Sequence, residues 1–341
     1  MYYNSSKMLF LSTLIGGLVI TISSNSWLSA WMGLEINLLS FIPLMSNSDN
    51  IYTTEAALKY FLVQALASAS LLFIIVAKAM METMFSLLQS PFVMIMIITP
   101  LMMKSGAAPL HWWFPSVMEG LTWLNCLILM TLQKIAPLML MSYLIDFNLF
   151  TTTIIVMSIV VGALGGYNQI SLRKILTYSS INHLGWMLTA MSLGENIWLI
   201  YFTIYSLLTM TIICIVSPLQ ISFINQTFLI NKNKLMKFIL FSSLLSLGGL
   251  PPFLGFLPKW IIIQSMLMNF SMTLTTLMVV MSLITLYYYL RITYSSFLVL
   301  SIEQSWDKNI IEFDKILIMA LFLSTISLVG LTLCTTLINL Y

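Results

Sequence analysis

The sequence contains very few charged side chains: Asp, Glu, Lys and Arg make up only 7% of its 341 residues, and the formal net charge is +3. In a soluble globular domain about a quarter of the residues are charged. The scarcity of charge therefore argues against a water-soluble domain. It also argues against nucleic acid as a partner, because no basic run with interleaved aromatic residues is present.

Cysteine and histidine are also scarce. Cys126, Cys214 and Cys334 lie in apolar stretches, without Cys-x-x-Cys spacing or paired histidine ligands nearby. They are predicted to be buried apolar thiols and not metal ligands or disulfides. The glycine clusters form no dinucleotide-binding fingerprint, because no strand precedes them and their spacing is wrong. We therefore expect no metal, nucleotide or redox cofactor in this chain.

Apolar residues make up 60% of the chain, against about 45 to 50% in soluble domains. Since a membrane-spanning helix needs about 20 apolar residues, the sequence predicts one all-α transmembrane bundle over residues 1–341, with about eleven helices. The loops are short, so function must lie within the membrane. The helices are expected near residues 8–24, 26–46, 55–80, 91–121, 123–145, 149–169, 171–192, 195–219, 236–270, 273–300 and 315–338.

Loop charges predict the orientation of the bundle. With eleven helices, basic loop residues fall on one side and acidic ones on the other, so the positive-inside rule places the N-terminus in the positive, cytoplasm-like or matrix compartment and the C-terminus opposite. Splitting either interrupted helix into two full spans would put basic loops on both sides. The basic side has Lys7, Arg173, Lys174, Lys232, Lys234, Lys237, Lys308 and Lys315, and the acidic side has Glu82, Asp146 and Glu195.

The fourth and ninth predicted helices are each interrupted by proline and glycine. Proline removes a backbone donor, and backbone freed at membrane depth is satisfied by protein or by water in a cavity, so broken helices tend to line transport pathways. Breaks five helices apart predict two inverted five-helix repeats, residues 8–145 and 149–300, followed by a final helix over 315–338. The predicted helix-break residues are Gly106, Pro109, Gly249, Pro251, Pro252 and Pro258.

Four ionisable residues, Glu35, Lys104, Lys134 and Lys259, are embedded in the apolar stretches. Each charge at the centre of a spanning helix costs about 2.5 to 3.5 kcal/mol on insertion scales, so these residues need a functional reason. The hypothesis is a proton pathway, in which burial and a neighbouring carboxylate together let a lysine load and release a proton.

Structural roles remain alternatives for each of these residues. Glu35 could instead be neutralised by protonation or by a structural lysine, and Lys134 could belong to a purely structural ion pair. A lysine beside a break can satisfy the carbonyls at the end of a half-helix. Lys104 and Lys259 are expected at matching places in the two halves. Lys59 suits either a pathway or an interfacial ion pair with Glu55. His183 suits either a proton relay or a hydrogen bond between helices.

Four segments carry a resemblance over nearly the whole chain. They are residues 103–117 around the first break, Gln133-Lys-Ile-Ala-Pro137, residues 174–186 around His183, and residues 248–260 around the second break. Together they resemble the chain 2 family of mitochondrial NADH-ubiquinone oxidoreductase, respiratory complex I, in its animal form. Each also resembles the related antiporter-like subunits and the cation/proton antiporters.

The resemblance implies a core membrane-arm subunit of a redox-driven proton pump in the mitochondrial inner membrane. Glu35, Lys104, Lys134 and Lys259 match the glutamate and three lysines of the family, and Lys59 and His183 match less decisive polar positions. FMN, iron–sulfur clusters, NADH and ubiquinone are then expected in other subunits. The expected partners are neighbouring antiporter-like and small membrane subunits, and lipids. A stand-alone cation/proton antiporter and a structural spacer subunit are the alternatives.

Overall fold

The computed structural model describes residues 5–47, 50–84, 91–227, 234–268, 271–294 and 315–340. Within these ranges the chain is all-α, and its only β feature is an isolated bridge between Ser171 and Phe223. The helices of the first part are α1 Ser5–Ser23, α2 Trp27–Met45, α3 Ile51–Met84, α4 Pro91–Ser105, α5 Trp113–Gly120, α6 Trp123–Met130 and α7 Leu132–Ser142. Those of the second are α8 Leu149–Gly166, α9 Leu172–Leu193, α10 Glu195–Leu219, α11 Lys234–Gly248, α12 Phe256–Met268, α13 Met272–Tyr294 and α14 Lys315–Leu340.

The predicted all-α membrane bundle is confirmed, and each predicted segment corresponds to one helix or one broken pair. Seven of the described helical segments are long and apolar enough to cross a membrane. Several predictions fall outside the described residues: positions 295–300 of the tenth predicted helix, Lys232 and Lys308. The side chains of Glu82, Lys234, Lys315 and Cys334 lie outside them too.

Three predicted helices are broken rather than two. The fourth and ninth are divided as expected, into α4 and α5 and into α11 and α12. The prediction of a continuous fifth helix over 123–145 was wrong, because Thr131 separates α6 from α7 with φ −113° and ψ −76°. Its hydroxyl donates to the Leu127 carbonyl at 2.7 Å. Such a bond back to the preceding turn bends a helix without any glycine or proline.

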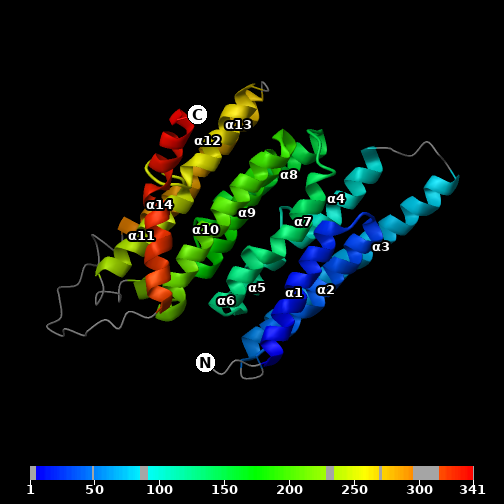
Figure 1. Cartoon of the computed structure of the whole chain (residues 1–341), viewed down its shortest axis with the longest axis horizontal. Coiled ribbons are helices and arrows are strands. Elements are labelled where there is room, and N and C mark those ends of the chain that lie inside the picture. The colour runs from blue at the N-terminus through cyan, green and yellow to red at the C-terminus, as the bar shows by residue number, and fades with distance from the viewer. Residues whose placement is uncertain are drawn as a thin grey trace. The chain divides into compact units, whose positions relative to one another are not determined.

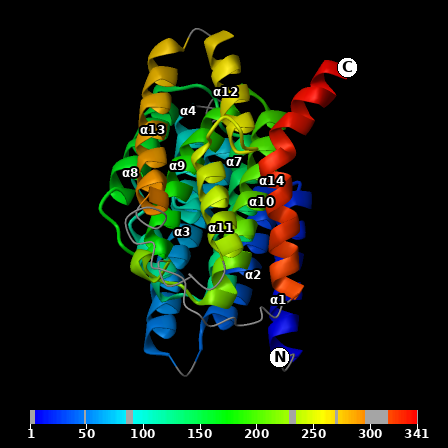
Figure 2. The ribbon, with the colours of Figure 1, turned by 90° about the vertical axis from the view of Figure 1, so that its left-hand side faces the viewer.

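The chain divides into two compact units, residues 1–154 and 155–341, with the boundary inside α8. In the first unit α2 packs between α1 and α3, and α3 also contacts α4 and α5 (Figure 1). In the second unit α10 contacts α9, α11, α12 and α14, and α13 packs on α11 (Figure 2). The predicted repeats meet instead between residues 145 and 149, and their bounds remain a prediction.

The two units have their helix breaks in the same register. Gly106 and Gly249 both have positive φ, of 77° and 84°, a conformation that favours glycine. They lie 143 residues apart, at positions 106 and 249, and each follows a helix of 15 residues. The next helix begins seven residues later, at Trp113 and at Phe256. This agreement supports two repeats, whose inverted orientation remains a prediction.

The helices before the breaks also correspond. Gly17 allows α1 to approach α2, because a Cβ there would lie 3.0 Å from the Asn37 backbone nitrogen. In the second unit a Cβ on Gly162 would lie 2.5 Å from the Asn182 backbone nitrogen. The glycines and the asparagines are each 145 residues apart, at 17 and 162 and at 37 and 182. Gly162 thus allows α8 to approach α9 closely.

Candidate functional site

Lys104 lies in the last turn of α4, immediately before the first break. It is only 7% exposed. The helix ends because Gly106 turns the chain, and the N–H groups of Gly106 and Ala107 both donate to the Met102 carbonyl, at 3.0 and 3.1 Å. The Trp113 indole donates to the Met103 carbonyl at 3.1 Å, and Gln64 Nε2 donates to the Lys104 carbonyl at 3.3 Å. Side chains from α5 and α3 therefore satisfy the end of this half-helix.

Lys134 lies between the Thr131 break and a proline in α7. Pro137 has no N–H, so the Gln133 carbonyl four residues earlier lacks its usual helical donor. The turn that carries Lys134 is consequently weak. The lysine itself is 2% exposed, and its Nζ lies over the Phe114 ring, 5.0 Å from the centroid. A cation above an aromatic face is stabilised by the negative face of the ring.

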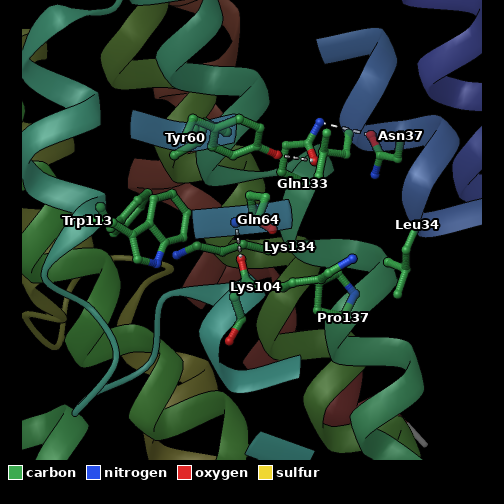
Figure 3. Close-up of a pocket in the computed structure, with 13 residues that line it drawn as sticks. Leu34, Asn37, Tyr60, Gln64, Lys104, Trp113, Gln133, Lys134 and Pro137 are labelled. Carbon is green, nitrogen blue, oxygen red and sulfur yellow. Dashed lines mark hydrogen bonds between the residues drawn. The ribbon is translucent and has the colours of Figure 1, made fainter. Parts of the chain in front are cut away.

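Both lysines line one small cavity in the first unit, and Figure 3 shows them with its other polar groups. The lining combines the two amines with amide and phenol groups from α2, α3 and α7. A site with several polar partners can hold water, whereas apolar cavities stay dry. The lining residues are Leu34, Asn37, Leu38, Tyr60, Gln64, Lys104, Ser105, Trp113, Phe114, Leu129, Gln133, Lys134 and Pro137.

Glu35 comes from α2, next to the cavity-lining Leu34. Its Oε2 is buried and has no hydrogen-bond partner within the described chain. Its charge interacts with Lys104 through space, yet the described residues place no ion pair between these two within 4.0 Å. The Glu35 carboxylate therefore acts on Lys104 electrostatically and without direct contact.

Three uncharged polar side chains that line the cavity are joined by hydrogen bonds. Gln133 Nε2 donates to Asn37 Oδ1 at 2.9 Å, and the Tyr60 hydroxyl donates to Gln133 Oε1 at 3.2 Å (Figure 3). The chain joins α7 to α2 and α3. Sequence reasoning missed these residues because, among polar groups, it considered only charged side chains and histidine. Uncharged polar residues inside the apolar spans were the signal that would have revealed them.

Lys259 lies after the second break, in α12. It is 6% exposed, and its Nζ donates to the Gly248 carbonyl at 2.9 Å and lies 5.9 Å from the Trp186 ring centroid. A lysine thus satisfies the end of half-helix α11, as the structural alternative expected. The prediction that Lys104 and Lys259 occupy matching places was wrong, since one precedes its glycine and the other follows it.

The predicted helix-break residues differ in their placement. Gly106 and Pro109 lie in the linker between α4 and α5, and Gly249, Pro251 and Pro252 lie in the linker between α11 and α12. Pro258 lies instead in the first turn of α12 and breaks nothing. Proline is tolerated there because the first N–H groups of a helix have no intrahelical acceptor.

The two further candidates lie in different environments. Lys59 Nζ forms an ion pair with Glu55 at 2.7 Å, and the two side chains are 49% and 56% exposed, which confirms the predicted i,i+4 pair. His183 is buried in the second unit. Its Nδ1 is 2.8 Å from the Tyr201 hydroxyl, and its ring lies 5.1 Å from that of Tyr205. This is the hydrogen bond between helices that the structural alternative expected.

Metal-binding geometry is not found in the described chain. No group of three or more histidine, cysteine, aspartate or glutamate side chains comes together there. Cys126 is buried and Cys214 is half-buried, and neither forms a disulfide within the described residues. The buried polar groups of the candidate site are amines, the Glu35 carboxylate, amides, the His183 imidazole and phenols.

The helical fold and its buried lysines define a class, the antiporter-like membrane proteins. The family described as NADH:quinone oxidoreductase/Mrp antiporter, transmembrane, matches residues 24–285. A chain of respiratory complex I from Thermus thermophilus has the same fold, with a TM-score of 0.81 and 24% identity over 95% of this chain and 78% of that one. A chain of the Mrp complex from Dietzia has a TM-score of 0.80 at 14% identity, over 96% and 75%.

Curated relatives narrow the class further. NADH-ubiquinone oxidoreductase chain 2 of Anopheles gambiae is 50% identical over 330 residues, which cover 96% of each chain. The Locusta migratoria protein of that name is 48% identical over 98% of each chain, and the Loxodonta africana protein is 40% identical over 84% of each. The chain belongs to the NADH-ubiquinone oxidoreductase chain 2 family.

Proposed function

We propose that this chain translocates protons through the membrane along a route that uses Glu35, Lys104, Lys134 and Lys259. As a chain 2 family member it is a multi-pass subunit of the proton-translocating NADH-ubiquinone oxidoreductase of the mitochondrial inner membrane. Its partners are other subunits of that complex. Electron transfer from NADH to ubiquinone drives the pump through FMN and iron–sulfur clusters in those subunits, and this chain carries no redox centre.

The observation that carries the proposal is the shared cavity of Lys104 and Lys134. Two buried amines on one polar cavity repel each other when both are charged, so a proton on one favours its absence from the other. Water in the cavity links them. A proton can then move from one amine to the next while the total charge of the cavity stays the same.

Glu35 acts as the control element of this route. When its carboxylate approaches Lys104, the ammonium form is stabilised, and when it withdraws, release of the proton is favoured. The buried Oε2, which has no hydrogen-bond partner in the described residues, is suited to such movement because no fixed donor holds it. The proton released from Lys104 is the one that Lys134 accepts through the cavity water.

Lys259 belongs to the same route in the second unit. Its bond to the Gly248 carbonyl gives the ammonium a fixed neutral acceptor, and a neutral amine can keep that bond by donating one of its remaining hydrogens. His183 is the neighbouring candidate relay. Lys59 is assigned an interfacial role, because its partner Glu55 and its exposure both place it at the surface of the described chain.

The proposed orientation places the N-terminus in the matrix and the C-terminus in the intermembrane space. Lys7 in the first turn of α1, and Arg173 and Lys174 in the first turn of α9, support it under the positive-inside rule. Lipids cover apolar side chains that neighbouring subunits leave exposed.

Replacing Lys134 with Met in the assembled enzyme tests the proposal. Protons translocated per NADH oxidised should fall, while assembly and electron transfer persist. Lys59→Met is the matched control and should leave the ratio unchanged. An unchanged ratio for Lys134→Met in a normally assembled enzyme would favour the structural spacer. Cation/proton exchange by the isolated chain in vesicles without NADH would favour a stand-alone antiporter.

A further inference from the structure

We propose that Gln133 is a positioning residue whose side-chain amide holds the turn carrying Lys134 against both α2 and α3. The inference rests on the proposed proton route, to which it adds a group that does not itself titrate. Gln133 directly precedes Lys134, and its amide makes one hydrogen bond to each neighbouring helix: Nε2 donates to Asn37 and Oε1 accepts from Tyr60.

The backbone around Lys134 needs such support because it is interrupted on both sides. The Lys134 N–H donates to the Thr131 carbonyl at 3.1 Å, three residues back, instead of the carbonyl four residues back that a regular α-helix uses. Pro137 then leaves the Gln133 carbonyl without its helical donor. Backbone hydrogen bonds alone therefore fix this turn poorly.

The two partners of Gln133 are themselves held firmly. Asn37 is 2% exposed and sits where α2 packs closely against α1, at Gly17. Tyr60 is 2% exposed, and its ring packs edge-on against Phe41 and Trp113, with centroids 5.4 and 5.8 Å away. Gln133 thus ties a weak turn to two rigid points.

The same aromatic row reaches the ammonium of Lys134. Trp113 packs on Phe114 with their ring centroids 5.5 Å apart, and Phe114 is the ring beneath Lys134 Nζ. The same row of aromatic rings therefore positions both the backbone of Lys134, through Tyr60 and Gln133, and its ammonium group, through Phe114. Loss of the Gln133 amide would let the turn move while the aromatic row stays in place, and the lysine would shift relative to Lys104.

The amide chain positions the lysine and does not itself conduct protons. A primary amide neither gains nor loses a proton at physiological pH, so proton transfer cannot pass through Gln133 and Asn37 as it does through water or an amine. Gln133 and Asn37 contribute by fixing the position of Lys134. Misplacing a reacting group by about 1 Å can slow a transfer by about 100-fold.

The test compares four variants in the assembled enzyme. Gln133→Met keeps the side-chain volume and removes both hydrogen bonds, and Tyr60→Phe removes one hydroxyl. Gln133→Glu in its neutral form keeps both bonds. Asn125→Leu is the matched control: Asn125 Nδ2 donates to the Leu44 carbonyl at 2.9 Å, an amide tie between α6 and α2 that does not line the cavity.

We expect Gln133→Met to lower the protons translocated per NADH as much as Lys134→Met does, with assembly unchanged. Gln133→Glu should restore most of that loss, which a purely structural role would not predict. Adding Tyr60→Phe to Gln133→Met should cause no further loss, because the hydrogen bond between these two residues is already absent in Gln133→Met. Asn125→Leu should keep the wild-type ratio. If Gln133→Met does not assemble, Tyr60→Phe alone should lower the ratio.

A wild-type ratio for Gln133→Met or, failing that, for Tyr60→Phe would overturn the inference. So would equal losses for Gln133→Met and Asn125→Leu. If Lys134→Met also keeps the wild-type ratio, the proposed proton route itself fails. If Lys134→Met lowers the ratio and Gln133→Met does not, only the positioning role fails.

Discussion

The two helix breaks use their lysines differently. In the first unit Lys104 precedes Gly106, and its Nζ donates no hydrogen bond within the described residues. In the second unit Lys259 follows Gly249, and its Nζ is bonded to the Gly248 carbonyl. The backbone geometry of the two breaks is nearly the same, so the difference lies in the side chains around them.

That difference shows which groups satisfy the end of each half-helix. In the first unit the Trp113 indole and the Gln64 amide donate to the last carbonyls of α4. In the second unit Lys259 performs this task for α11. An ammonium that is relieved of capping can respond to a carboxylate such as Glu35, and one that caps a helix is held in place. The first unit is accordingly the more responsive half.

The largest expected effect is a loss of stability that tests whether the second break is packed more tightly than the first. A Cβ on Gly255 would overlap the Ser246 carbonyl oxygen, whereas Trp112 stands at the corresponding place in the first break. Gly255→Ala should therefore destabilise the chain by about 3 kcal/mol, at the upper end for overpacking. The yield of assembled complex should fall. Gly16→Ala is the control, because no atom lies within 4 Å of a Cβ there, and normal yield for both variants would contradict the packing.

The next effect distinguishes the capping lysine from the responsive one. Lys259→Met leaves the Gly248 carbonyl without its donor and should cost about 1 to 3 kcal/mol. Lys104→Met removes no capping bond and should leave stability almost unchanged. Both variants should lower the number of protons translocated per NADH oxidised. Thermal unfolding of the purified complex measures the difference. Equal losses of stability would show that the two lysines play the same structural part.

A smaller effect concerns the glycines themselves. Alanine at Gly106 or Gly249 should cost about 1 to 2 kcal/mol, because both have positive φ. Only at Gly249 would the new Cβ also reach the lysine, 3.0 Å from Lys259 Nζ, whereas at Gly106 the nearest atoms are 3.5 Å away. Gly249→Ala should therefore lower protons per NADH more than Gly106→Ala does. A larger loss for Gly106→Ala would reverse the comparison.

The smallest effect is expected at the surface. Lys59→Met removes an exposed i,i+4 ion pair, which contributes about 0.3 to 0.5 kcal/mol. The melting temperature and the proton ratio should both stay close to wild type. A large fall in protons translocated per NADH would indicate that Lys59 belongs to the proton pathway, and would contradict a route made only of buried lysines.

Sequence alone predicted the apolar spans and both proline–glycine breaks, because their signals are local. It did not predict the Thr131 break, because threonines such as Thr211 and Thr285 also bond back to the preceding turn in helices that stay continuous. It placed Lys104 and Lys259 at matching sites because proximity to a break along the chain does not reveal which side of the glycine a lysine occupies. The Asn37–Gln133–Tyr60 chain joins residues up to 96 positions apart, which no local pattern encodes.

The most direct test of the proton route is whether Lys134 changes protonation during turnover. Infrared difference spectra of the assembled enzyme, resting against NADH-driven, would be recorded with isotopically labelled lysine. The account predicts a label-sensitive ammonium band that changes on turnover, disappears in Lys134→Met and persists in Lys59→Met. A lysine band that is the same in the wild type and in Lys134→Met would contradict it.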